Sequence, residues 1–323
     1  MRGSVSVKNN KLSMISVVLS FRNESDVIDL LISRLEATLE KEPEDYEIIF
    51  VNDDSTDHSQ KLLEKHHARN KRIKIINMAR RFGVTECVFA GLGYASGDAV
   101  IYMDCDLQDP PELITDLLLK WRAGADMVYT VRVQRDGEKP IRMFFTKQAY
   151  RIIGAFSEVD LPVEAGDFRL LDKKVVCEIL KLPETEPYLR GLTNWVGFRQ
   201  AKVEYKRASR AGGATHFPGV FSVSAVQQFM RGVTSFSFFP LFVLLGIGVI
   251  VFGTSLTILF FALALHFTQV FWSPWVYALI LAFLFWGGII SALGVIGLYI
   301  ARIYSDVRGR PRFIIKDTSG FDI

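Results

Sequence analysis

The stretch AVIYMDCDLQDPPE, which covers Ala99–Glu112, decides the fold. Its first five residues are apolar, and they predict a buried strand. The strand ends in carboxylates at Asp104 and Asp106, with the Gln108 amide after them, and oxygen ligands at alternate positions suit Mg²⁺ or Mn²⁺. The two prolines that follow favour the start of a helix. An ordinary polar loop before a helix would have the same composition, so the rest of the chain has to separate the two interpretations.

Strands and helices alternate on both sides of this stretch. Apolar runs predict strands at 14–21, 46–51, 72–77 and 99–103, and later at 126–131 and 198–207. Helical spacing of apolar residues predicts helices at 25–40, 84–94, 173–181 and 188–196, with a further helix that ends near Arg69. The alternation predicts an α/β domain with βαβ crossovers around a mainly parallel sheet. In such sheets, ligands bind beyond the carboxyl ends of the strands.

Polar clusters follow three of the predicted strands. They are Asn23 with Glu24, Asp53 with Asp54, and Asp104 with Asp106. Because parallel strands end at one edge, the clusters are expected to converge into a site for a metal-bound nucleotide diphosphate. The chain has no G-x-G-x-x-G after its first strand and no G-x-x-x-x-G-K-[ST], which excludes an ordinary dinucleotide or P-loop site. The aspartates at 53 and 54 have an alternative role as N-caps of the following helix.

Half of the 323 residues are hydrophobic, and the excess lies near the C-terminus. Residues 232–301 contain no Asp, Glu, Lys or Arg. Since about 20 apolar residues span a bilayer, this tract predicts a hairpin of two transmembrane helices. The expected organisation is a cytoplasmic α/β domain at 1–217, an interfacial amphipathic helix at 218–235, a membrane hairpin at 236–301 with helices at about 238–265 and 275–300, and a basic tail at 302–323.

Basic residues lie at the outer ends of the predicted hairpin and not in its turn. By the positive-inside rule, both ends of the chain are expected on the cytoplasmic side of a bacterial inner membrane. Small residues recur along the second span and favour close helix packing, either within the chain or between protomers of a homo-oligomer. The net charge of +3 gives no reason to expect nucleic-acid binding, and the three scattered cysteines are typical of reduced cytosolic thiols.

Arginines follow the predicted nucleotide-binding region. Arg132 and Arg142 lie in a basic segment, and Arg207 and Arg210 lie in a loop rich in Gly and Ala beside the apolar tract. Guanidinium groups bind phosphate through paired hydrogen bonds. The loop is therefore expected to contact a phosphate, with a solvated linker or contact with anionic lipid headgroups as alternatives.

Six motifs follow one another along the chain: Ser20–Glu24, Asn52–Asp57, Asp104–Gln108, Arg132-x-x-Arg135, Gly166–Leu170 and Arg207-x-x-Arg210-x-x-Gly213-x-Thr215. Together they resemble the motifs of the family 2 glycosyltransferases, and within them those of the polyprenyl-phosphate glycosyltransferases, which include bactoprenol glucosyltransferases and dolichol-phosphate mannose synthases. The likeness covers nearly the whole chain and departs from the usual pattern at Ser20, Arg22 and His216. It implies a GT-A fold, a UDP-sugar donor, a polyprenyl phosphate acceptor and an inverting transfer that gives a β-linked product.

The resemblance also implies roles for individual residues. The nucleotide would be held by Ser20, Asn23, Glu24, Asp53, Asp54 and Asp104. The metal, Mg²⁺ or Mn²⁺, would be held by Asp104, Asp106 and Gln108. The acceptor phosphate would meet Arg132, Arg142, Arg207, Arg210 and Thr215. The expected catalytic residues are Asp106, Asp167, Arg132 and Arg210. For Asp167, a role as base or acceptor-orienting group and a structural ion pair with Arg169 or another arginine are both open.

The expected activity is transfer of glucose from UDP-glucose to undecaprenyl phosphate at the cytoplasmic membrane face. The first alternative is another sugar, such as mannose, N-acetylglucosamine or an aminoarabinose derivative. A processive polysaccharide synthase is the second, and the absence of a Gln-x-x-Arg-Trp motif counts against it. The third is a lipid-binding scaffold with a degenerate transferase domain, and the intact set of Asp104, Asp106 and Gln108 counts against that.

Overall fold

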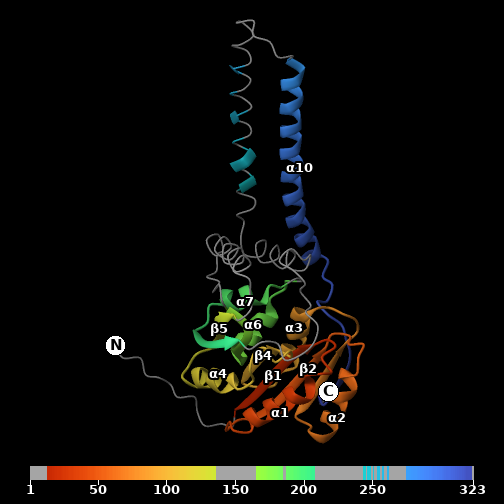
Figure 1. The fold of residues 1–323 in the computed structure, drawn as a ribbon, viewed down its shortest axis with the longest axis vertical. Helices are drawn as coiled ribbons and strands as arrows, with labels where there is room; N and C mark the ends of the chain where they lie inside the picture. Colours follow the sequence, from red (N-terminus) through yellow and green to blue (C-terminus); the bar gives the residue numbers. More distant parts are fainter. Residues whose placement is uncertain are drawn as a thin grey trace, which may run out of the picture.

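The computed structural model describes residues 13–135, 165–184, 187–207 and 274–321, with scattered positions between 243 and 261. Figure 1 shows an α/β domain from which one long helix, α10, extends as a separate rod. The predicted interfacial helix at 218–235, most of the predicted first span and the loop after Arg207 lie outside the described residues.

The four predicted strands of the first half of the chain are confirmed and form the parallel part of one sheet. They are β1 (Met14–Phe21), β2 (Asp45–Asn52), β3 (Ile73–Met78) and β4 (Ala99–Asp104). β1 pairs in parallel with both β2 and β4, and β2 pairs in parallel with β3. The helices that connect them are α1 (Ile28–Leu39), α2 (Ser59–Arg69) and α3 (Val84–Tyr94).

The second half of the domain extends the sheet beyond β4. Its elements are α4 (Leu113–Arg122), β5 (Met127–Arg135), β6 (Ala165–Asp172), α6 (Lys173–Lys181), α7 (Leu189–Trp195) and β7 (Gln200–Arg207). β6 runs antiparallel to both β4 and β5, and β5 runs parallel to β7. The sheet order is β7-β5-β6-β4-β1-β2-β3-β8. The motif at 166–170, for which the sequence predicted no strand, therefore lies in the middle of the sheet.

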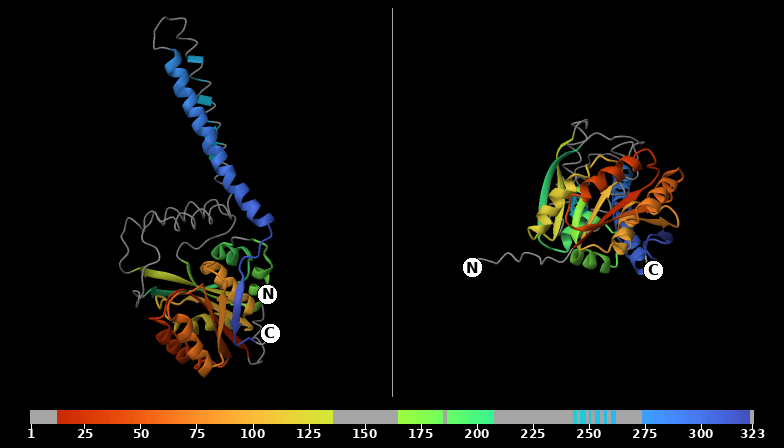
Figure 2. Two further views of the ribbon diagram at one scale, coloured as in Figure 1. Left: turned by 90° about the vertical axis from the view of Figure 1, so that its right-hand side faces the viewer. Right: turned by 90° about the horizontal axis from the view of Figure 1, so that it is seen from below.

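Helices cover both faces of the sheet, because neighbouring residues of each buried strand point to opposite sides. On β1, Val17 and Leu19 pack with α1, α2 and α4, whereas Val18 packs with α3, α6 and α7. The two views of Figure 2 show these helix layers on either side of the strands. Gly91 brings α3 close to β1, since a Cβ atom at this position would collide with Val18.

Strand directions bring the expected site residues to one edge of the sheet, which we call the acid edge. β1, β2 and β4 end there with the three polar clusters, and β5 and β7 also end there, with Arg132 paired to Tyr205 and Arg135 to Arg207. The antiparallel β6 begins at the same edge, so Asp167 lies near its start.

The C-terminal part of the chain contains one long helix and one short strand. α10 (Pro274–Val307) includes the predicted second span, and within it Phe285–Val307 is long and apolar enough to cross a membrane. After α10 the chain returns to the domain (Figure 1) and forms β8 (Ile315–Ser319), antiparallel to β3. The sequence predicted a basic tail here, and the structure adds an edge strand to the sheet.

Candidate active site

Sheet register places the three polar clusters next to one another. Ser20 on β1 pairs with Asp104 on β4, and Phe21 pairs with Asn52 on β2. The loops that follow these strands therefore begin side by side at the acid edge. The convergence expected from the sequence is present, while the roles of the individual residues stay predictions.

Unusual backbone conformations are concentrated in these same loops. Among the described residues, the non-glycine positions with positive φ are Asn23 (56°), Asp54 (58°) and Leu107 (56°). This conformation is unfavourable for side chains other than glycine and persists only where neighbouring contacts hold it. Each of the three loops after β1, β2 and β4 contains one such residue, which is typical of a functional site.

Hydrogen bonds join the loop after β1 to the loop after β2. The Asn23 N–H donates to Ser55 Oγ (3.1 Å), and the Thr56 N–H donates to Asn23 Oδ1 (2.8 Å). The Glu24 N–H donates to Ser59 Oγ (3.0 Å) at the start of α2, and Glu24 is buried. The two loops thus form one hydrogen-bonded unit that contains the expected uridine-binding residues.

Asp53 connects this unit to the loop before α3. Its Oδ1 accepts hydrogen bonds from the Phe82 N–H (2.6 Å) and the Gly83 N–H (3.2 Å), and the Asp53 side chain is buried. The alternative role of Asp53 as an N-cap of α2 is therefore wrong. That helix is preceded by His58, and its Ser59 N–H donates to Asp57 Oδ1 (3.0 Å).

The loop after β4 holds the expected metal ligands. Asp106 Oδ1 accepts a hydrogen bond from the Gln108 N–H (3.1 Å), which closes a tight turn. Burial, and then the charges of Glu24, Asp104 and Asp106, raise the pKa of the Cys105 thiol well above its usual range. A raised pKa keeps the thiol protonated at neutral pH, and the protonated form is the weaker nucleophile.

Asp104, Asp106 and Gln108 would supply two carboxylates and an amide, a hard oxygen set that fits Mg²⁺ or Mn²⁺. Within the described part of the chain, no three His, Cys, Asp or Glu side chains gather closely enough to form a complete metal cage. Next to Asp104, Ser20 Oγ is buried without a hydrogen-bond partner, so a bound ligand has an unsatisfied polar group to meet.

Asp167 forms an ion pair with Arg190. The Arg190 Nε–H donates to Asp167 Oδ1 (2.5 Å), and Nη2 donates to Oδ2. The sequence left Arg169 or another arginine open as the partner. It is not Arg169, whose buried guanidinium donates to Gly166 O (3.2 Å) and Thr193 Oγ1. Sequence reasoning missed Arg190, which carries no signal beyond one cation on a short amphipathic helix.

The Asp167–Arg190 pair lies close to the expected metal ligands. Burial raises the pKa of Tyr102 to about 12, and the charges that also act on this phenol include Asp167, Arg190 and Asp104. Tyr102 Oη is buried and has no hydrogen-bond partner. Asp104, Asp167 and Arg190 are therefore neighbours at the acid edge.

A second buried pair joins the loop after β4 to β7. Asp109 is fully buried, and Tyr205 Oη donates a hydrogen bond to its Oδ1. Tyr205 is followed two residues later by Arg207, the first arginine of the expected acceptor loop. This contact, which the sequence did not suggest, connects the expected metal loop with the strand that leads to the acceptor loop.

Comparison with known proteins agrees with this geometry. Residues 16–180 match the model of glycosyl transferase family 2, and they contain all three polar clusters and Asp167. The chain belongs to glycosyl transferase family 2. Its α/β domain has the GT-A fold, as the resemblance of its motifs implied.

Relatives of this family 2 glycosyltransferase match over nearly their full length. The uncharacterized glycosyltransferase YkcC of Bacillus subtilis (strain 168) is 39% identical over 95% of this chain and 94% of its own. The SfII prophage-derived bactoprenol glucosyl transferase of Shigella flexneri is 36% identical over 94% of this chain and 97% of its own. The glucosyl-3-phosphoglycerate synthase from Mycobacterium tuberculosis, solved with Mn²⁺, UDP-glucose and phosphoglyceric acid, is more distant. It is 17% identical over 69% of this chain and 78% of its own, with a TM-score of 0.47.

The side chains expected to bind the acceptor phosphate lie outside the described part of the structure. Arg142, Arg210 and Thr215 lie outside the described residues, and for Arg132 and Arg207 only the backbone position at the acid edge is described. Their role in binding the acceptor phosphate stays a prediction.

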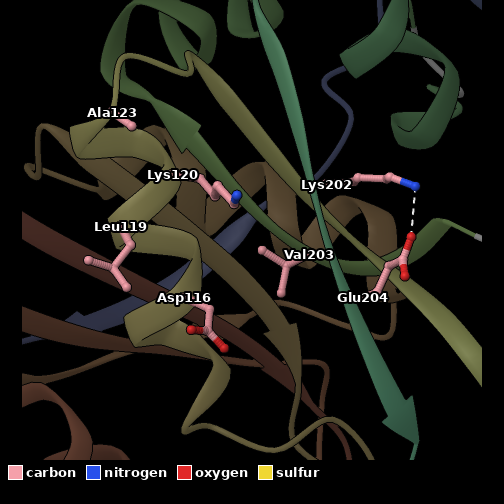
Figure 3. Close-up of a pocket in the computed structure, with 7 residues that line it drawn as sticks. All are labelled: Asp116, Leu119, Lys120, Ala123, Lys202, Val203 and Glu204. Atoms are coloured by element: carbon pink, nitrogen blue, oxygen red, sulfur yellow. Dashed lines mark hydrogen bonds and ion pairs between the residues drawn. The ribbon is translucent and has the colours of Figure 1, made fainter.

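A pocket of about 560 Å³ lies elsewhere on the domain, between α4 and the edge strand β7. Figure 3 shows the residues that line it: Asp116, Leu119, Lys120, Ala123, Lys202, Val203 and Glu204. The ion pair between Lys202 and Glu204 (2.7 Å) lies at its side. None of the expected catalytic, nucleotide or metal residues contributes to this pocket.

Proposed function

We propose that this family 2 glycosyltransferase transfers one sugar, with glucose the first candidate, from a UDP-sugar to a polyprenyl phosphate. Relatives named bactoprenol glucosyl transferase match 94% of the chain and support both the acceptor class and the sugar. The proposed location is the cytoplasmic face of a bacterial inner membrane. The proposed arrangement is two spans with both termini inside, in a homo-oligomer.

The observation that carries the proposal is where the chain leaves and re-enters the sheet. β7 ends at the acid edge with Arg207, and the apolar tract at 232–301 follows it in the sequence. The chain returns from α10 through residues 308–314, and the Ala79 N–H donates to Ile314 O (2.9 Å) just beyond the end of β3. Seven steps of chain, from Val307 to Ile314, span at most about 25 Å, so α10 ends within that distance of the point where β3 reaches the acid edge.

The exposed surface of α10 supports a membrane setting. Large apolar side chains are exposed along the helix, among them Trp275, Phe285, Trp286, Ile290, Leu293 and Ile296. An apolar surface of this length is unfavourable in water and is expected to be covered by lipid. An acceptor that is itself a membrane lipid can therefore reach the acid edge.

On the donor side, Glu24, Asp53 and Asp54 would hold the uridine, and Asp104, Asp106 and Gln108 would hold Mg²⁺ or Mn²⁺. When bound, the metal ion supplies Lewis-acid stabilisation of the charge that develops on the departing UDP. The acceptor phosphate oxygen forms a bond to the anomeric carbon as the bond to UDP breaks. The electron pair leaves with UDP, and attack from the opposite face inverts the configuration.

On the acceptor side, the main requirement is for positively charged side chains that bind the phosphate. The second pKa of a phosphate monoester is about 6, so the nucleophile is already largely a dianion at neutral pH and does not need a strong general base. Arg132, Arg142, Arg207 and Arg210, with Thr215, would bring this dianion close to the charged donor. We assign Asp167, held by Arg190, to the orientation of the acceptor.

A transfer assay tests this proposal. The purified full-length chain is incubated with undecaprenyl phosphate, Mn²⁺ and a panel of radiolabelled UDP- and GDP-sugars. Label from UDP-glucose is expected in the organic phase with wild type and not with Asp106→Ala. Transfer from no UDP-sugar, or equal transfer by Asp106→Ala, would overturn the assignment.

A further inference from the structure

A row of polar side chains runs along the acid edge, away from the site and into the C-terminal strand. Asn52, Asn77 and Asp317 lie opposite one another on β2, β3 and β8. Asn77 Nδ2 donates to Asp317 Oδ1 (2.5 Å), and Asn52 Nδ2 donates to Asn77 Oδ1 (3.1 Å). Because each amide both donates and accepts, the orientation of one side chain sets that of the next. We call these three residues the edge row.

The edge row continues into the loops of the donor site. Asn52 Oδ1 accepts a hydrogen bond from the Ser55 N–H (2.9 Å), and Ser55 Oγ accepts one from the Asn23 N–H (3.1 Å). Ser55 directly follows Asp54, and both Asn23 and Asp54 have positive φ. Asn52 is buried, and its Nδ2 also donates to Gln60 Oε1 (3.0 Å) in α2. One branch of the hydrogen bonds that hold the uridine-binding loops thus ends at Asp317.

Several contacts hold residues 308–321, which we call the tail, in this position. The Arg312 guanidinium lies over the Phe89 ring (4.7 Å to the centroid) and donates to Leu182 O. At the other end, the Phe321 ring contacts the Tyr94 ring edge-on, with centroids 5.0 Å apart. The tail is thus attached to α3 at two places and to β3 between them.

The pairing between β8 and β3 is adjusted so that Asp317 meets Asn77. Asn77 pairs with Asp317, but the next residue, Met78, pairs with Ile315, so the register skips Lys316. Such a bulge changes which residues of an edge strand face their partners. At this position it brings a carboxylate to the end of the edge row.

We propose that the tail, residues 308–321, is a positioning element of the donor site, with Asp317 and Asn77 as its positioning residues. The proposal rests on the assignment of the loops after β1 and β2 to binding a nucleoside diphosphate. Because only residues 308–314 separate α10 from β8, the segment that ties the domain to the apolar helix also orders the donor loops.

The test compares Asp317→Ala with Asp317→Asn, which keeps an oxygen acceptor for Asn77, in the full-length chain in detergent. Titration with UDP and Mn²⁺ is expected to show binding about 3- to 10-fold weaker in Asp317→Ala, the loss typical of one hydrogen bond. Asp317→Asn and the neighbouring Thr318→Val are expected to bind like wild type. Amide hydrogen exchange of the Asn52–Asp57 peptide is expected to be faster in Asp317→Ala alone.

Hydrogen exchange and UDP binding together distinguish a failure of the tail's positioning role from a failure of the proposed function. If Asp317→Ala leaves both the exchange of Asn52–Asp57 and the affinity for UDP unchanged, the positioning role of the tail is wrong. If wild type itself does not bind UDP, the proposed function fails, and exchange alone then decides whether the tail orders the loops. Equal effects of Asp317→Ala and Thr318→Val would show a general loosening of β8 and would also overturn the proposal.

Discussion

Arg190 on α7 donates two hydrogen bonds to the carboxylate of Asp167 on β6, although Arg169 lies only two residues from Asp167 on the same strand. Arg169 is buried and is used to join β6 to α7 through Thr193. The two arginines of this region therefore have different functions: one forms part of the acid edge, and the other stabilises the fold beneath it.

Replacing Arg190 with Lys is expected to lower kcat by about 100-fold, because Lys keeps the charge but cannot form the paired contact that orients Asp167. Affinity for UDP should change little, which distinguishes an acceptor-side role from general damage to the site. Initial rates at saturating donor, together with a UDP titration, measure both quantities.

A matched control is available on α4, where Arg122 forms a similar paired contact with Glu44 away from the acid edge. Arg122→Lys should leave kcat unchanged. A wild-type kcat in Arg190→Lys would show that the Asp167–Arg190 pair has no part in transfer.

Replacing Arg169 with Met is expected to reduce stability rather than UDP affinity. The change leaves the hydrogen-bond acceptors at Gly166 and Thr193 without their buried donor, at a cost of about 1–3 kcal/mol. A lower thermal midpoint of the detergent-solubilised chain, with UDP affinity near that of wild type, is the expected result. An unchanged midpoint would contradict the structural role.

Tyr205→Phe is expected to weaken the contact between the metal loop and β7. The change removes the hydroxyl that donates to the fully buried Asp109, and the loss of such a bond costs about 1–3 kcal/mol. The expected results are a lower thermal midpoint and a higher Mn²⁺ concentration for half-maximal transfer. If the Mn²⁺ dependence is unchanged, Asp109 supports the fold but not the metal loop.

Glu47 is expected to make stability depend on pH. Burial alone would raise its pKa, but hydrogen bonds from Lys74, Ser16 and Ser96 outweigh burial and hold the pKa below its usual range. A carboxyl group with a lower pKa in the folded state contributes stability above its unfolded pKa of about 4.3, and loses it as the pH falls through the folded pKa.

Glu47→Gln should therefore lower the thermal midpoint at pH 7 and flatten its decline on acidification below about pH 4.5. The comparison is between melting curves of wild type and variant from pH 7 down to about pH 2.5, so that the range extends well below the unfolded pKa. Parallel curves for the two proteins would show that Glu47 is not a source of the acid sensitivity.

Local sequence patterns were sufficient to predict the strands of the first half of the sheet. β1 to β4 are short apolar runs with polar ends, and the helices between them have apolar residues at helical spacing, so period and composition agree with the structure. The polar clusters could be brought together from the sequence because parallel strands end at one edge. The family assignment came from the resemblance of the motifs and is confirmed.

Local patterns did not predict β6, β8 or the role of Arg190. These features arise from contacts between distant parts of the chain. β6 carries Asp167 and the buried Arg169, whose partners lie on α7, so the strand does not look apolar in the sequence. β8 is short and polar, and it pairs with a strand some 240 residues earlier, as the Asn77–Asp317 bond shows. No local period reveals such an edge strand.

The identity of the product tests the central claim most directly. The full-length chain is incubated with undecaprenyl phosphate, Mn²⁺ and UDP-glucose labelled with carbon-13 in the sugar, and the lipid extract is analysed by mass spectrometry. The expected product is undecaprenyl monophosphate that carries one labelled hexose, absent in Asp106→Ala. Label found only in free glucose or in a polymer, with the lipid phosphate unchanged, would contradict the account.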